Sequence, residues 1–121
     1  MVPFYQPHDL VVQVKKRNAL GGLDELSGTE ELNDTALQNL AGNSLINFIK
    51  PGLPPFLQIH RDADTTVPYA QSAIFEAKMK AAGNSCDTIT IPGGGHGMGG
   101  WAKLNSNDAV QMIAWLKQTL N

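Results

Sequence analysis

Acidic and basic side chains follow two apolar segments in the second half of the chain. Asp62 and Asp64 come directly after the run Phe56–His60, and His96 lies in a glycine-rich loop after Thr88–Ile91. A histidine acts as a general base when a carboxylate fixes its far ring nitrogen. One acid loop and one histidine loop therefore indicate two members of a catalytic triad.

The segments that carry these loops are expected to form one parallel βαβ unit. Phe56–His60 is bounded by prolines and acidic turn residues, which is typical of a short buried strand. Tyr69–Ala82 has a wide apolar helical face and should end at Gly83-Asn84, and Thr88–Ile91 predicts the second strand. Because the carboxyl ends of parallel strands meet at one edge, the two loops should lie together there.

Shorter elements are expected in the first half of the chain. Val2–Tyr5 reads as a strand end at a sheet edge, because Pro3 cannot donate to a ladder. Asp9–Leu20 is weakly helical, and the acidic stretch Asp24–Asn33 reads as a loop. Asp34 is expected to cap a short helix that follows this loop.

The last helix is expected to begin near Ser106 or Asn107, with apolar residues at three- and four-residue steps. The pattern as a whole predicts an α/β fold of about three parallel strands flanked by helices. At 121 residues, the chain is expected to form a single domain, residues 1–121.

Composition excludes several function classes. The net charge is -2 and the one basic cluster is Lys15-Lys-Arg17, which argues against a nucleic-acid partner. No apolar run is long enough to span a membrane, and the N-terminus lacks a signal-peptide hydrophobic region, so the expected location is cytoplasmic or undirected. Cys86 is the single cysteine and is expected to be a packing residue.

The residues alone do not decide which aspartate is the catalytic acid. Asp62 lies nearer the strand end, whereas Asp64 precedes Thr-Thr-Val-Pro, whose Pro68 sets the start of the next helix. One of the two carboxylates is expected to bond to backbone amides and shape the loop.

Two longer motifs stand out, Pro54-Pro-Phe-Leu-Gln-Ile-His-Arg-Asp-Ala-Asp-Thr-Thr-Val-Pro-Tyr-Ala-Gln-Ser72 and Pro92-Gly-Gly-Gly-His-Gly97. They resemble the C-terminal third of α/β-hydrolases, most closely the esterase branch with acetyl-, acetylxylan- and feruloyl-esterase members. That family carries His-Gly-x-x-Asp-x-x-Val-Pro and Gly-x-x-His-Gly segments, so the resemblance implies Asp64 as triad acid and His96 as base. Phe4-Tyr-Gln-Pro-His-Asp-Leu10 is similar to the family's Gly-Pro-x-Asp-Leu loop.

The chain departs from that family in two ways. Arg61 stands where the family has glycine, and it would be strained if the position required a positive φ. The sequence contains no Gly-x-Ser-x-Gly nucleophile elbow. It also contains no His-Gly-Gly-like segment of the kind that forms the family's oxyanion loop. Ser44 and Ser85 are half-matches to the elbow and are expected to be turn and cap residues.

The resemblance therefore implies the C-terminal part of a serine carboxylic-ester hydrolase, with the nucleophile-bearing part absent and little activity in the isolated chain. Met98 and Trp101, beside His96, are expected to contact substrate, a small ester or acylated sugar. No cofactor is implied. The expected partner is a second copy joined through an open strand edge, or a missing N-terminal half.

Two alternatives remain open. A metal-dependent hydrolase would use His60, Asp62, Asp64 and His96 as nitrogen and oxygen ligands. A non-catalytic remnant would bind an acyl or sugar ester, or would serve as an assembly module. The identity of the acyl group and of the alcohol does not follow from the residues.

Overall fold

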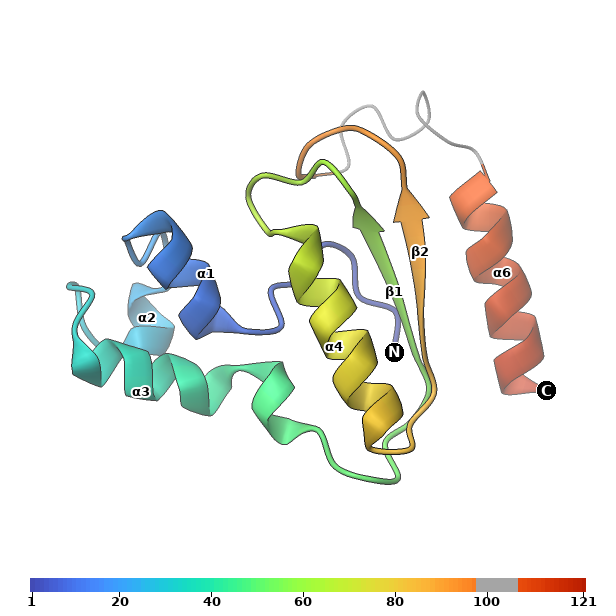
Figure 1. Ribbon diagram of the computed structural model, residues 1–121, viewed down its shortest axis with the longest axis horizontal. Helices are drawn as coiled ribbons and strands as arrows, with labels where there is room; N and C mark the ends of the chain where they lie inside the picture. Colours follow the sequence, from blue (N-terminus) through green and yellow to red (C-terminus); the bar gives the residue numbers. More distant parts are fainter. Residues whose placement is uncertain (98–106) are drawn as a thin grey trace. The chain divides into compact units, whose positions relative to one another are not determined.

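The computed structural model describes residues 1–97 and 107–121 (Figure 1). These residues cluster into two compact units. One unit contains Met1–Gln6 and Lys50–Asn121, and the other contains Pro7–Ile49. Met98 and Trp101, the predicted substrate contacts, lie outside the described residues.

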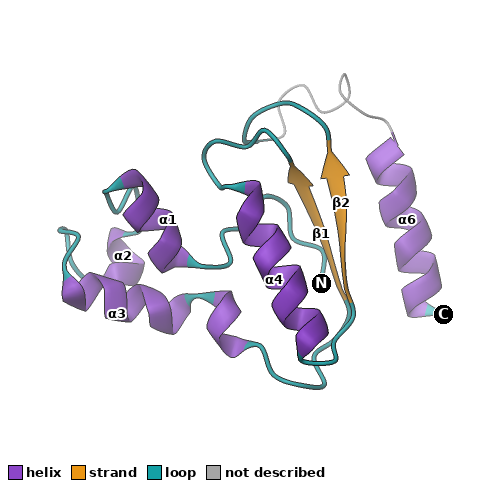
Figure 2. Cartoon of the chain, in the orientation of Figure 1, coloured by secondary structure: helices purple, strands orange, loops and turns teal. Residues whose placement is uncertain are grey.

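A parallel pair of strands forms the centre of the first unit. β1 (Phe56–Arg61) and β2 (Cys86–Ile91) pair in register from Phe56 opposite Cys86 to Arg61 opposite Ile91. Helix α4 (Tyr69–Ala81) connects them, and α6 (Asn107–Leu120) follows the histidine loop (Figure 2). The predicted βαβ unit is therefore confirmed.

Helices α4 and α6 cover opposite faces of these strands. Successive strand residues point to opposite sides, so alternate residues contact each helix. On one face, Phe56 packs against Phe75 of α4 with ring centroids 5.3 Å apart. On the other face, an apolar cluster of Leu57, Ile59, Ile89 and Ile91 packs against Met112 and Trp115 of α6, and also against Val2 and Phe4.

The N-terminal segment adds a third parallel element at the free edge of β1. Ile59 N donates to Pro3 O at 3.1 Å and Tyr5 N donates to Ile59 O at 3.1 Å. Phe4 and Ile59 form an isolated parallel bridge rather than a full strand. Pro3 has no N–H, and the φ of 50° at Tyr5 ends the extended conformation. Of the about three parallel strands expected, two form as strands, and the third is reduced to this single bridge.

Gly83 ends α4, as the sequence predicts. Its φ is +80°, and its N–H donates to Lys80 O at 2.9 Å while Asn84 N donates to Met79 O at 2.9 Å. This pair of bonds is a Schellman motif, which needs a residue in the left-handed region. Asn84 then fastens the chain before β1, because its side chain bonds Lys50 O and Leu53 N, each at 2.9 Å.

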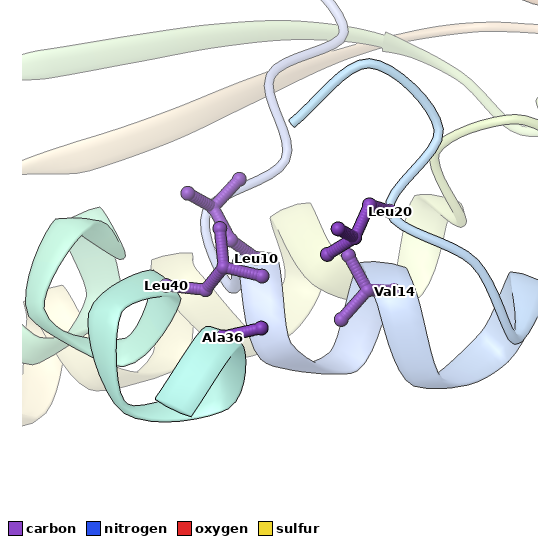
Figure 3. Close-up of a cluster of buried hydrophobic side chains, with 5 residues drawn as sticks. All are labelled: Leu10, Val14, Leu20, Ala36 and Leu40. Carbon is purple, nitrogen blue, oxygen red and sulfur yellow. The ribbon is translucent and has the colours of Figure 1, made fainter. Parts of the chain in front are cut away.

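The second unit is helical and has its own small core. It contains α1 (Leu10–Arg17), α2 (Asp24–Ser27), α3 (Asp34–Asn43) and the 3₁₀ helix η1 (Leu45–Phe48). Five buried residues form the core shown in Figure 3: Leu10, Val14, Leu20, Ala36 and Leu40. In the residues that the structure describes, no helix is long and apolar enough to cross a membrane.

Two predictions in this unit are wrong in detail. Asp24–Asn33, expected as a loop, begins with the short helix α2. The cap of α3 is Asn33 and not Asp34, because Asn33 Oδ1 accepts from Ala36 N at 2.9 Å. A four-residue helix is too short to show a 3.6-residue period, and two adjacent residues can both cap a helix, so sequence patterns miss both features.

Candidate active site

The turn after β1 fixes the side chain of Asp64. Asp64 Oδ1 accepts hydrogen bonds from Thr66 N and Val67 N, each at 2.9 Å. This arrangement, an aspartate bonded to amides two and three residues ahead, closes the turn before α4. The side chain is buried. The turn therefore leaves the second oxygen, Oδ2, to face other groups.

His96 meets that second oxygen. The distance from His96 Nδ1 to Asp64 Oδ2 is 2.8 Å, although the residues are 32 positions apart in the sequence. The carboxylate is buried, whereas the His96 side chain is 39% exposed. The parallel strands thus bring the acid loop and the histidine loop together, as the sequence analysis expected.

The surroundings of Asp64 keep it ionised. Burial alone would raise the pKa of this carboxyl group, but hydrogen bonds from His96, Val67 and Thr66 act against burial. Their combined effect lowers the pKa below its ordinary value. A carboxylate at neutral pH can accept the Nδ1 proton of His96 and fix the tautomer of that ring.

The other candidate acid, Asp62, contacts the same loop at a different place. Asp62 Oδ1 accepts from the Gly93 main-chain N–H at 2.7 Å. Among the described residues, Asp64 is the carboxylate that contacts the His96 ring. The two aspartates, which the residue pattern alone leaves tied and the family resemblance separates, differ in geometry: Asp64 faces the imidazole and Asp62 faces the loop backbone.

A second histidine, His60, lies buried beneath the site; the sequence analysis considered it only as a ligand in the metal-dependent alternative. His60 Nε2 lies 2.9 Å from Val67 O and 3.3 Å from Asp64 Oδ2, and its Nδ1 lies 2.6 Å from Ser72 Oγ. Because a carbonyl oxygen only accepts, Nε2 carries the proton and Nδ1 accepts from the Ser72 hydroxyl.

Ser72, His60 and Asp64 have the order of a serine triad but are sealed from solvent. His60 is 0% exposed and Ser72 is 1% exposed, so no substrate reaches this hydroxyl. The contact joins the end of β1 to α4 across 12 positions of sequence. In the sequence, the one signal for this contact is the position of His60, which matches the histidine of the family motif. The residue spacing does not identify Ser72 as its partner.

Arg61 is not strained, and its place beside the site was not predicted. Its φ is not positive, since Tyr5 and Asn18 are the described non-glycine residues with that conformation. Its side chain is buried, and Nη1 donates to Gly95 O at 3.1 Å. The guanidinium lies 5.8 Å from the centre of the Tyr5 ring, and that ring meets His96 edge-on with centroids 5.6 Å apart.

Ser44 and Ser85, the two partial matches to the nucleophile elbow, occupy structural positions. Ser44 is buried, accepts from Leu10 N at 2.9 Å and donates to Leu40 O at 2.8 Å. Ser85 precedes β2, at the strand end opposite to the histidine loop. The described residues contain no group of three or more His, Cys, Asp or Glu side chains arranged to hold a metal ion.

A family comparison identifies most of the chain. Residues 25–121 match the model of the prolyl oligopeptidase family. The match includes both loops of the candidate site. A comparison with curated protein sequences finds no match.

Solved structures of esterases share the fold. A thermophilic esterase from Thermogutta terrifontis with bound propionate is 26% identical, with a TM-score of 0.67 over 97% of this chain and 41% of that chain. A truncated carbohydrate esterase from gut microbiota is 25% identical, with a TM-score of 0.66 over 98% of this chain and 41% of its own.

A peptidase shows the same fold at lower identity. Pyrococcus horikoshii acylaminoacyl peptidase is 18% identical, with a TM-score of 0.74 over 98% of this chain and 20% of that chain.

The chain spans 38% and 41% of the length of two solved Thermogutta terrifontis esterase structures that it matches. The expected likeness to α/β-hydrolase esterases is confirmed for this partial fold.

Proposed function

The chain belongs to the prolyl oligopeptidase family of hydrolases, and on that premise we propose that it supplies the acid and the base of a serine carboxylic-ester hydrolase. In this proposal Asp64 orients His96, and His96 removes the proton from a serine hydroxyl. The observation that carries the proposal is the 2.8 Å contact between His96 Nδ1 and Asp64 Oδ2.

The geometry of the pair suits this chemistry. When Nδ1 donates to Asp64, the lone pair of the ring is on Nε2, where a serine hydroxyl can be deprotonated. The serine oxygen then attacks the ester carbonyl, and the protonated His96 gives its proton to the departing alcohol. The partial exposure of His96 supports access for both partners, while the buried carboxylate stabilises the imidazolium.

We propose small carboxylic esters, or acylated sugars, as the substrates. Two solved relatives, 26% and 25% identical, are named as esterases, one with bound propionate and one as a carbohydrate esterase. The peptidase relative is only 18% identical and supports the fold alone. Met98 and Trp101 stay a prediction as substrate contacts, because they lie outside the described residues.

The serine of this triad is proposed to come from a segment outside residues 1–121. Three of the described serines are buried in hydrogen-bonded positions, namely Ser27, Ser44 and Ser72, and Ser85 lies at the wrong strand end. The isolated chain should then show little activity. The short span relative to the solved esterases supports this part of the proposal.

The outer edge of the N-terminal segment is the proposed joining surface. Pro3 and Tyr5 bond to Ile59 of β1, so the peptide groups of Val2 point to the other side. In the described part of the chain, no strand pairs with that outer edge. An edge of this kind accepts a further strand, from the nucleophile-bearing part or from a second copy. A sedimentation mass that stays monomeric at all concentrations would contradict the second copy.

A chimera tests the proposed function. Residues 1–121 would replace the part of the Thermogutta terrifontis esterase that they match, and the product would be treated with a fluorophosphonate and a short p-nitrophenyl ester. We expect labelling and hydrolysis by the chimera, and no adduct on the chain alone. His96→Ala and Asp64→Asn should reduce hydrolysis about a thousandfold or more.

The matched control is Asp87→Asn, a carboxylate on β2 that accepts from Trp115 Nε1 at 2.9 Å and does not contact the site. This variant should keep the activity of the chimera. An adduct on the chain alone that requires His96 would overturn the proposal, because a serine of this chain would then be the nucleophile. A folded chimera that stays inactive would favour the non-catalytic alternative.

A further inference from the structure

Two consecutive residues at the end of β1 hold the backbone of the histidine loop. Arg61 Nη1 donates to Gly95 O at 3.1 Å, and Asp62 Oδ1 accepts from Gly93 N at 2.7 Å. The two contacts therefore fasten a carbonyl immediately before His96 and an amide three residues before it. Within the described part of the chain, these are the two side chains that hydrogen-bond to the main chain of residues 93–97.

The loop needs fastening because its residues are intrinsically mobile. Gly93, Gly94 and Gly97 have φ values of +71°, +76° and +97°, and none of these glycines carries a side chain to pack. Glycine loses more conformational freedom on ordering than any other residue. Without external contacts, the backbone on either side of His96 would sample several conformations, and the ring would leave Asp64.

The burial of the Arg61 side chain lowers the stability of the fold compared with an apolar residue of the same size. The residue is 2% exposed, and its Nε and Nη2 have no hydrogen-bond partner among the described residues. No carboxylate of the described residues forms an ion pair with it. A buried charge with one hydrogen bond costs more free energy than an apolar residue of the same size. In the described part of the chain, the contacts that use the arginine side chain are those to Gly95 O and to the Tyr5 ring.

Arg61 also reaches His96 through the Tyr5 ring. The guanidinium lies over that ring at 5.8 Å, and the ring meets the imidazole at 5.6 Å and 61°. The positive charge therefore holds both the backbone before His96 and the aromatic ring that flanks it. A glycine at position 61 makes neither contact.

We propose that Arg61 and Asp62 are positioning residues that keep His96 against Asp64, in the tautomer with its proton on Nδ1. The inference rests on the proposed role of His96 as the base. If the loop loosens, the imidazole loses Asp64 and can take the Nε2–H form. That form has no lone pair on Nε2 and cannot accept a serine proton.

Ring-nitrogen NMR of the full chain tests the inference without any activity. Long-range ¹H–¹⁵N spectra distinguish the Nδ1–H and Nε2–H forms of neutral histidines. We expect wild-type His96 in the Nδ1–H form, and a fall of about fivefold in the ratio of Nδ1–H to Nε2–H in Arg61→Met, as for loss of one hydrogen bond. Arg61→Lys, which can still donate to Gly95 O, should restore most of the ratio.

Asp62→Ala is the second variant, and because Asp62 is exposed it should fold even if Arg61→Met does not. It should also lower the ratio. His60 is the internal reference, because its Nε2 faces Val67 O, and neither Arg61→Met nor Asp62→Ala removes that acceptor. An unchanged His96 tautomer in folded Arg61→Met, or in Asp62→Ala when Arg61→Met does not fold, overturns the inference.

Asp64→Asn separates this inference from the proposed function. If Asp64→Asn changes the tautomer and the two positioning variants do not, only the inference about Arg61 and Asp62 fails. If Asp64→Asn also leaves the tautomer unchanged, the acid–base pair itself fails, and the proposed function fails with it.

Discussion

His60 Nε2 lies 3.3 Å from Asp64 Oδ2, the same oxygen that lies 2.8 Å from His96 Nδ1. One carboxylate oxygen thus faces two histidines, one buried and one exposed, while the other oxygen faces two backbone amides. Carboxylates that accept several hydrogen bonds are held in one orientation and stay ionised. His60 therefore forms the floor of the site, and it joins the acid loop to α4 through Ser72.

Replacing His60 should destabilise the protein far more than replacing His96. His60→Ala leaves a cavity and leaves Ser72 Oγ without its partner, so we expect a loss of about 3 kcal/mol in the free energy of unfolding. His96→Ala removes a half-exposed ring and should cost about 1 kcal/mol or less. Urea unfolding of both variants measures the difference. Equal losses would contradict a structural role for His60.

The pKa of Asp64 predicts a pH dependence of stability. Its pKa is lowered in the folded state, so the carboxylate contributes stability above its unfolded pKa of about 4. That contribution is lost as the pH falls through the lower folded pKa. The unfolding free energy of wild type should therefore drop more steeply than that of Asp64→Asn below about pH 4. Parallel curves from urea titrations at several pH values would exclude this effect.

Local signals explain why the sequence predicted the core of the site. The strand segments around Ile59 and Ile89 are short apolar runs between turn residues, and Gly83 marks the helix end that the Schellman motif requires. Because β1 and β2 are adjacent parallel strands, their carboxyl ends lie at the same edge of the sheet. The meeting of Asp64 and His96 follows from that topology.

Other features depend on tertiary contacts that no local pattern contains. Asp62 and Asp64 are two residues apart in one loop, so no local pattern shows which carboxylate faces the imidazole; the family resemblance favours Asp64, and the fold places Asp64 Oδ2 against His96. The contact of His60 with Ser72 joins a strand to a helix. Burial of Arg61 runs against the usual exposure of arginine, so composition gives no warning of it.

Two glycines should respond to alanine in opposite directions. Gly83 has a φ of +80° at the end of α4, where alanine is strained, so Gly83→Ala should destabilise by about 1 kcal/mol. Gly42 lies in α3 with no atom within 4 Å of an added Cβ, so Gly42→Ala should stabilise by about 0.5 kcal/mol or more. Thermal unfolding of both variants gives the signs, and equal signs would contradict the assigned backbone conformations.

Cys86 should be unreactive in the folded chain. Burial, with the negative charges of Glu76 and Asp87, raises the pKa of its thiol to about 11. At pH 8 the thiolate, which is the reactive form, should then be about two-hundredfold rarer than in the unfolded chain, where the pKa is about 8.5. A disulfide reagent such as DTNB should react slowly with native protein and rapidly in urea. Because the chain has a single cysteine, the reaction reports this thiol alone, and equal rates in both states would show that it is exposed or ionised in the fold.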